Sequence, residues 1–78
     1  METLSLQEAK EALHNNLKIS HIGWPPVYID GVSYPQYVYI NEDNILVDEN
    51  DALLNLATFW YGIDGIYMYQ SGWLIIND

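Results

Sequence analysis

The chain begins with apolar residues that recur three and four positions apart, a spacing typical of one face of an α-helix. The members of this stripe are Leu6, Ala9, Leu13 and Leu17. Ser5 precedes the stripe and Glu8 lies three residues further on, as in the S-x-x-E capping box that begins many helices. The polar pair Asn15-Asn16 weakens the end of the pattern. We therefore predict a first helix over about residues 6–15.

A β-hairpin is the next element that the pattern predicts. Asp30-Gly31 lies between two short apolar runs, residues 27–29 and 32–34, and an Asp-Gly pair favours the type I′ turn of a two-residue hairpin. Pro35 interrupts the returning strand, which is typical of an edge strand or a bulge. Residues 19–26, before the hairpin, end in two prolines, and a residue before proline prefers extended backbone. We predict that they form a connector.

Tyrosine and aliphatic residues alternate over residues 37–40. Tyr37 and Tyr39 therefore lie on one face of the predicted strand and two aliphatic residues on the other. A polar turn follows over residues 41–44, and residues 45–47 form the next short strand. We expect the aliphatic face to pack against the helices. The tyrosine face is then an ordinary half-exposed sheet face, or a surface that a partner or a second copy covers.

A second helical pattern begins after residue 50. Its apolar members are Leu53, Leu56, Ala57 and Trp60. Asn50 or Asp51 is the predicted N-cap and Gly62 fits the C′ position. The acids Asp48, Glu49 and Asp51 then lie at or before the positive end of the helix dipole. A strand over residues 59–61 is the competing assignment.

The last element predicted is another hairpin. Residues 66–69 and 73–76 flank a three-residue turn that contains glycine. The resulting order α-β-β-β-α-β-β predicts an α+β fold. We expect one small domain over residues 1–78, with about five short antiparallel strands and two helices packed on one face.

The charge of the chain has a single sign after Lys18. No Lys or Arg follows that residue, and the formal net charge is −9. The same part of the chain contains all three Trp, all seven Tyr and the one Phe. So few cations exclude direct nucleic-acid binding through phosphates and binding to anionic membranes. A negative field favours encounter with basic proteins, although it can also serve solubility alone.

Cysteine and the patterns of a signal peptide and of a membrane-spanning stretch are all missing from the sequence. The chain has no Cys, so it has neither a disulfide nor a Cys-based zinc site. Its first residues lack the basic segment and apolar run of a signal peptide. No apolar stretch approaches the ~20 residues that span a membrane. We therefore expect a cytoplasmic protein.

Five carboxylates gather within residues 41–51 with no basic neighbour. They are Glu42, Asp43, Asp48, Glu49 and Asp51. Three interpretations compete: solvated loop ends and helix capping, an acidic surface that binds Arg and Lys, or a divalent-cation site. An EF-hand loop needs a glycine and a later glutamate at fixed offsets, and neither acidic group has that glycine. We therefore expect no metal and no other cofactor.

The binding interpretation has a specific physical form. Alternate residues of a strand project on one face ~6.6 Å apart, so carboxylates there can take the positions of nucleic-acid phosphates. We expect a charged footprint of Glu42, Asp43, Asp48, Glu49 and Asp51, extended by Asp30 or Asp64. Tyrosine and tryptophan dominate interface hot spots. The candidate apolar anchors are Tyr37, Tyr39, Tyr67, Tyr69 and Trp73.

Catalysis finds little support in the sequence. His14 falls on the polar helix face and His21 in the connector, so we expect two surface histidines and no enzyme activity. No glycine-rich phosphate loop occurs, and so small a core leaves little room for a pocket of ~300 Å³. A small hydrolase or sugar-binding protein remains a distant alternative.

In size, charge and absence of catalytic motifs, the chain resembles the small acidic inhibitors that phages and mobile elements make against host nucleases. These include anti-CRISPR and anti-restriction proteins and uracil-DNA glycosylase inhibitors. The resemblance implies a non-catalytic nucleic-acid mimic that acts in the host cytoplasm on the basic surface of a nucleic-acid-processing enzyme. Two alternatives remain open. One is an immunity or antitoxin protein, and the other is a homodimer or larger homo-oligomer sealed through the tyrosine face.

Overall fold

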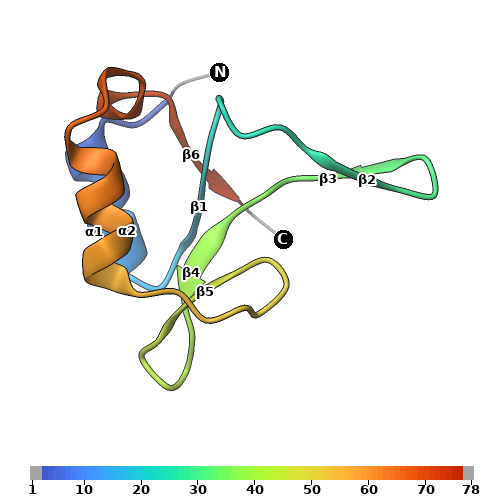
Figure 1. Ribbon diagram of the computed structural model, residues 1–78, viewed down its shortest axis with the longest axis horizontal. Coiled ribbons are helices and arrows are strands. Elements are labelled where there is room, and N and C mark those ends of the chain that lie inside the picture. The colour runs from blue at the N-terminus through green and yellow to red at the C-terminus, as the bar shows by residue number, and fades with distance from the viewer. Residues whose placement is uncertain (1–2, 77–78) are drawn as a thin grey trace.

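The computed structural model describes residues 3–76, which form a four-stranded antiparallel sheet, two helices on one side of it and a projecting hairpin (Figure 1). The order of elements is α1 (Leu6–His14), β1 (Lys18–His21), β2 (Val27–Ile29), β3 (Val32–Tyr34), β4 (Val38–Ile40), β5 (Leu46–Asp48), α2 (Leu56–Asp64), the 3-10 helix η1 (Tyr67–Gln70) and β6 (Trp73–Ile76). The strand order of the sheet is β5-β4-β1-β6. The predicted α+β class is confirmed.

Helix α1 begins at the predicted capping box. The Ser5 hydroxyl accepts a hydrogen bond from the Glu8 amide, and the Glu8 carboxylate accepts one from the Ser5 amide. Each bond satisfies an amide that the first helical turn leaves without a partner. The helix ends at His14, one residue before the predicted end, and Asn16 then adopts a positive φ of 63°. Its buried residues are Ala9, Ala12 and Leu13.

Strand β1 was not expected, because the sequence predicted a connector over its residues. It lies in the middle of the sheet and pairs antiparallel with both β4 and β6. Ile19, Ser20 and His21 are all buried in it. The Ser20 hydroxyl donates to the backbone oxygen of Gln36, sixteen residues away, so its polarity is satisfied by a contact that local sequence does not reveal.

Helix α2 begins later than predicted. Its N-cap is Asn55, whose side chain accepts a hydrogen bond of 2.9 Å from the Thr58 amide. The predicted caps Asn50 and Asp51 lie in a turn, because residues 52–54 extend along β5 instead of entering the helix. Gly62, the predicted C′ residue, lies inside the helix, and the strand proposed for residues 59–61 is absent, since α2 covers them.

The predicted C-terminal hairpin is wrong. Residues 67–70 form η1, and β6 pairs with β1 rather than with the segment before it. Trp73 is fully buried, and its Nε1 donates a hydrogen bond of 2.8 Å to the backbone oxygen of Tyr69. This packing and this hydrogen bond hold residues 67–70 in a helical turn against Trp73 instead of in a strand. Gly72 has a φ of +87° and allows the tight entry into β6.

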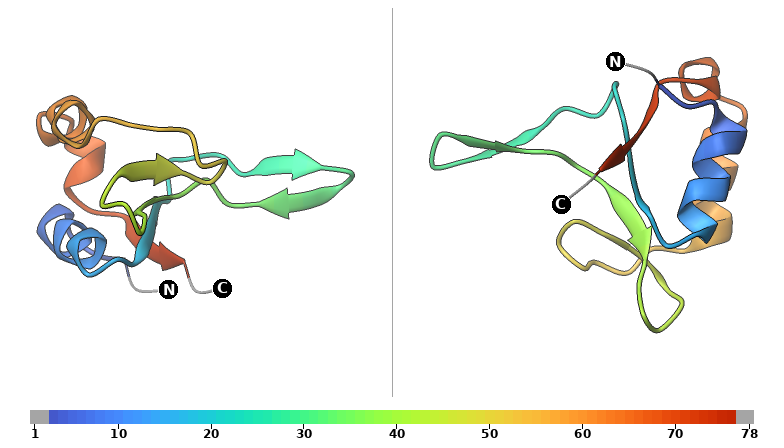
Figure 2. Two further views of the ribbon diagram at one scale, coloured as in Figure 1. Left: turned by 90° about the horizontal axis from the view of Figure 1, so that it is seen from below. Right: turned by 180° about the vertical axis from the view of Figure 1, so that it is seen from behind.

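The core lies between the sheet and the helices. Its largest fully buried side chains are Trp73, Leu13 and Ile19. In β4, Val38 and Ile40 are buried while Tyr39 is half-exposed, so the predicted alternation is confirmed there. Figure 2 shows α1 and α2 together on one side and the β2–β3 hairpin leaving the body on the other.

The β2–β3 hairpin (residues 27–34, hereafter the arm) has the predicted turn. Asp30 and Gly31 both have positive φ, at 51° and 81°, as a type I′ turn requires. All six strand residues of the arm are exposed. At its base, the Gln36 side chain donates a hydrogen bond to the Pro25 backbone oxygen. This bond joins the two segments that flank the arm, and the Ser20 hydroxyl, bound to the Gln36 backbone oxygen, links them to β1.

Candidate binding surface

The five clustered carboxylates do not share one role. Asp48 closes the turn after β5: its Oδ1 accepts hydrogen bonds from the Asn50 amide at 2.8 Å and the Ala52 amide at 3.0 Å. Asp51 has a φ of 61° in the same turn. Asx side chains commonly stabilise turns in this way. Part of the acidity in this segment therefore serves local structure.

Tyr37 and Tyr39 lie together, as predicted, with ring centroids 6.0 Å apart. The Lys18 ammonium lies over both rings, at 5.1 and 5.5 Å from their centroids, within the range of a cation–π contact. The Tyr39 hydroxyl donates a hydrogen bond of 2.7 Å to Asp51 Oδ1. That bond first, and then burial and the charge of Asp51, raise the pKa of Tyr39 above 10.0. Because Lys18 and Asp51 contact these tyrosines, only part of their surface is accessible to a partner.

Glu49 is half-buried beside the same tyrosines. Its Oε2 accepts a long hydrogen bond, 3.4 Å, from the Tyr37 amide. A carboxylate has about four lone-pair positions for hydrogen bonds. One long bond to an amide leaves this group able to accept from a charged donor.

Glu42 and Asp43 lie at the exposed β4–β5 turn. The Asn41 side chain builds this turn by accepting hydrogen bonds from the amides of Asp43 and Ile45, at 2.9 and 3.0 Å. The two carboxylates are therefore held on an ordered turn and point their charge into solvent. They match the predicted footprint better than Asp48 does.

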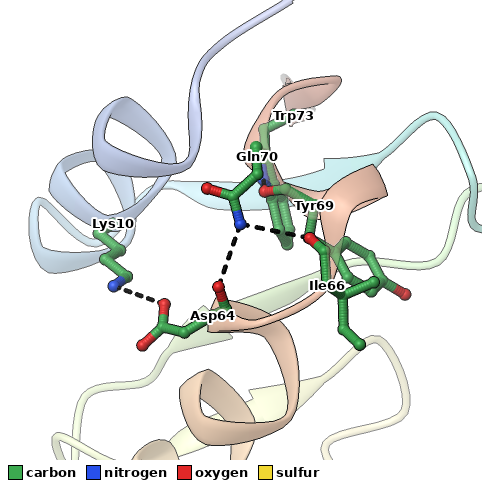
Figure 3. Close-up of polar contacts among 6 residues, drawn as sticks. All are labelled: Lys10, Asp64, Ile66, Tyr69, Gln70 and Trp73. Atoms are coloured by element: carbon green, nitrogen blue, oxygen red, sulfur yellow. Dashed lines mark hydrogen bonds and ion pairs between the residues drawn. The ribbon is translucent and has the colours of Figure 1, made fainter.

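Asp64 is engaged elsewhere. Its Oδ1 lies 2.9 Å from Lys10 Nζ, an ion pair between the end of α2 and α1 (Figure 3). The Gln70 side chain donates hydrogen bonds to the backbone oxygens of Asp64 and Ile66 close by. Lys10 offsets the charge of Asp64, so this residue extends the acidic footprint poorly.

The predicted anchors of the last segment separate into two kinds. Trp73 is 0% exposed, so it stabilises the core and offers no surface to a partner. Tyr69 is half-buried, its ring 4.8 Å from that of His21, and its hydroxyl accepts a hydrogen bond from Trp24 Nε1. Tyr67 is 93% exposed and remains available.

His21 is not the surface residue that the sequence predicted. It is 3% exposed and lies in β1. Its Nδ1 accepts a hydrogen bond of 2.9 Å from the Gly23 amide, and its Nε2 lies 2.7 Å from the Ser71 carbonyl oxygen. These contacts assign the neutral tautomer with the proton on Nε2. The residue joins β1 to the segment before β6 and has a structural role. His14 is exposed, as expected.

Sequence reasoning missed the exposed arm as a candidate surface. The pairing register places Val27 opposite Tyr34 and Ile29 opposite Val32, so these four side chains share one face. The hairpin pattern located the strands but not their isolation from the core. The sequence around the Asp-Gly turn is nearly uncharged, but no local signal distinguishes an exposed hairpin from one packed on the core.

A groove of about 310 Å³ lies where this apolar face meets the body. Val27, Ile29 and Tyr34 line it from the arm. Tyr37, Glu49 and Ile76 are among the residues that line it from the body. The arrangement combines aromatic and aliphatic walls with one carboxylate, which suits recognition of a side chain that is apolar along its length and cationic at its end.

Comparison with protein family models, with curated proteins and with solved structures finds no match for this chain. We therefore infer its function from the geometry of the chain. Within residues 3–76, no group of three or more His, Cys, Asp and Glu side chains is placed to hold a metal ion. No helix in that range has the length and apolar character needed to cross a membrane.

Proposed function

We propose that this chain is a non-catalytic binding protein that inhibits a basic partner by covering its nucleic-acid-binding surface. One observation carries the proposal: the surface has exposed carboxylates and an exposed apolar hairpin, while the two lysines of the chain are already engaged, Lys10 with Asp64 and Lys18 over two tyrosine rings. These carboxylates are Asp30, Glu42, Asp43 and Asp51. Interfaces that bind tightly combine apolar anchors with a polar rim, and the arm and the acids supply these two parts.

Electrostatics and the arm contribute to different steps of binding. The net charge of −9 accelerates encounter with a basic surface and directs the acidic side of the protein toward it. The exposed carboxylates then pair with Arg and Lys side chains that would otherwise bind phosphates. Apolar contacts of the arm slow dissociation. The bound inhibitor excludes nucleic acid because both need the same groove.

The footprint we propose is narrower than the sequence indicated. Asp48 and Asp64 are engaged in a turn and in an ion pair, so we assign the partner contacts to Glu42 and Asp43, with Asp30 at the tip of the arm. Asp51 contributes through its second carboxylate oxygen, because the Tyr39 hydroxyl occupies only Oδ1. Glu49 contributes from the groove. A phage anti-defence protein and an immunity protein would use this chemistry equally and differ only in the enzyme that they block.

Capture of partners on the immobilised chain, followed by competition, tests the proposal. We expect a captured enzyme that binds nucleic acid, that duplex DNA or RNA displaces, that high salt releases, and whose activity falls stoichiometrically as the chain is added. Glu42→Lys weakens capture, whereas Glu11→Lys on the exposed face of α1 applies the same charge change and does not. Equal effects of the two reversals, or a partner that nucleic acid fails to displace, would refute the mimicry.

A further inference from the structure

The apolar face of the arm, formed by Val27, Ile29, Val32 and Tyr34, is exposed to solvent. Ile29 and Val32 pair across it with exposures of 56% and 52%, and Tyr34 is 49% exposed. A two-stranded hairpin has little stability in water without a third strand or a packed layer. Exposed apolar patches of this kind usually mark interaction sites. The face is therefore a candidate for cover by another molecule.

The groove at the base of this face gives its occupant a defined position. One wall is the arm, with Val27, Ile29 and Tyr34. The opposite wall includes Tyr37 and Glu49. An occupant thus meets apolar side chains on one side, and an aromatic ring and a carboxylate on the other.

Charge selects among the possible occupants. Asp30 is the only charged residue between positions 22 and 41, and Glu49 is acidic. A second copy of the chain would bring a net charge of −9 against another −9, which opposes association. Lys18 lies over Tyr37 at one wall of the groove, so its charge offsets only one of the two carboxylates of Asp30 and Glu49. The groove therefore favours an occupant that carries positive charge.

We propose that the groove binds an extended segment of the basic partner in which an arginine lies next to an apolar side chain. This inference rests on the proposed function and specifies how the partner is held. The apolar side chain packs on Ile29 and Tyr34, and the guanidinium pairs with the Glu49 carboxylate. Arginine fits better than lysine, because its planar guanidinium can bind a carboxylate through two N–H groups and stack on a tyrosine ring.

Short peptides provide a direct probe. Acetyl-Val-Arg-Val-amide is titrated into ¹⁵N-labelled protein, and the same peptide with citrulline in place of arginine serves as the neutral control. We expect the arginine peptide to shift the backbone amide signals of Tyr37, Glu49 and Ile76. Replacing a charged donor by a neutral one should weaken binding about five-fold. Equal binding of the two peptides would contradict the assignment of arginine.

Matched variants locate the contact. Glu49→Gln should weaken the arginine peptide about five-fold and leave the citrulline peptide unchanged. Glu11→Gln, on the exposed face of α1, removes the same charge outside the groove and should change neither. Ile29→Thr on the apolar face should weaken both peptides, whereas Tyr28→Thr on the opposite face of the arm should not. Equal effects of the members of either pair would overturn the groove as the site.

The two proposals fail in different ways. If a nucleic-acid enzyme is captured and inhibited but Glu49→Gln and Ile29→Thr bind it like the unmodified chain, the groove assignment is wrong and the proposed function survives. If the arginine peptide binds as expected but no basic partner is inhibited, the groove stands and the proposed function fails. Signals of the arm that shift on dilution without peptide would identify a second copy as the occupant and overturn the inference.

Discussion

The Tyr39 hydroxyl donates a 2.7 Å hydrogen bond to Asp51 Oδ1, which joins β4 to the turn after β5. The bond stabilises the neutral phenol and raises the pKa of Tyr39 above its ordinary value of 10.0. A raised folded-state pKa adds stability that is fully present below the unfolded-state pKa and is lost as pH rises through the folded-state pKa. Ionised Tyr39 would place a second negative charge beside Asp51.

We predict that Asp51→Asn lowers the pKa of Tyr39 toward 10.0. The phenolate absorbance of Tyr39, isolated as the difference between the chain and its Tyr39→Phe variant, should rise at lower pH in the Asp51→Asn background. The unfolding free energy of the unmodified chain should also fall more steeply with pH above 10.0 than that of the variant. An unchanged titration curve would contradict the role of Asp51.

The buried His21 side chain gives a second prediction. His21→Ala removes an aromatic ring from the core and leaves the Gly23 amide and the Ser71 carbonyl without their partner. We expect a loss of about 3 kcal/mol in the free energy of unfolding. The exposed His14→Ala serves as the control and should stay within about 0.5 kcal/mol of the unmodified chain. Urea unfolding measures both, and similar values for the two variants would contradict a structural role of His21.

Asp48 allows the hydrogen bonds of its side chain to be tested separately from its charge. Asp48→Ala removes the acceptor of two amide hydrogen bonds and should cost about 1–2 kcal/mol of unfolding free energy. Asp48→Asn keeps an oxygen at the same position and should restore most of that loss while removing the charge. Thermal unfolding of the two variants separates the two roles. A stability loss as large for Asn as for Ala would show that the charge, rather than the turn, matters.

Two glycines should respond to alanine in opposite directions. Gly72 has a φ of +87°, and a Cβ there would lie 3.0 Å from Ile22 Cγ1 and 3.1 Å from His21 Nε2. Gly72→Ala should therefore cost about 1–3 kcal/mol. Gly62 lies within α2 with open space around it, so Gly62→Ala should stabilise the chain by about 0.5–1 kcal/mol. Denaturant midpoints that shift in the same direction would contradict this account.

Local signals explain which elements the sequence predicts well. Helix α1 begins at the Ser5 capping box and the arm turns at Asp30-Gly31, where the determining contacts span only a few residues. Strand β1 has no such signal. Its Ser20 and His21 are polar side chains whose partners lie at Gln36 and Ser71, so only the folded chain reveals why they are buried.

The sequence predicted which residues are acidic, but not which of them are free to meet a partner. The sequence identifies the acids, but their division between turns, ion pairs and free surface depends on contacts such as Lys10 with Asp64. Asp51 and Asn55 are both plausible helix caps by residue type. Pairing of residues 52–54 with β5 selects Asn55, and no local pattern contains that choice. The exposure of the arm likewise follows from where the body ends, not from its own residues.

The pairing of β1 with β6 has a consequence for how the chain folds during synthesis. Strand β1 (Lys18–His21) lies between β4 and β6 (Trp73–Ile76), so β1 lacks one of its two neighbours in the sheet until β6 is made. Trp73, the largest fully buried side chain among residues 3–76, belongs to the same strand β6. A nascent chain that stops before Trp73 leaves the buried face of β1 open to chaperones and proteases. The sheet and its core are therefore complete only when β6 has been made and paired with β1.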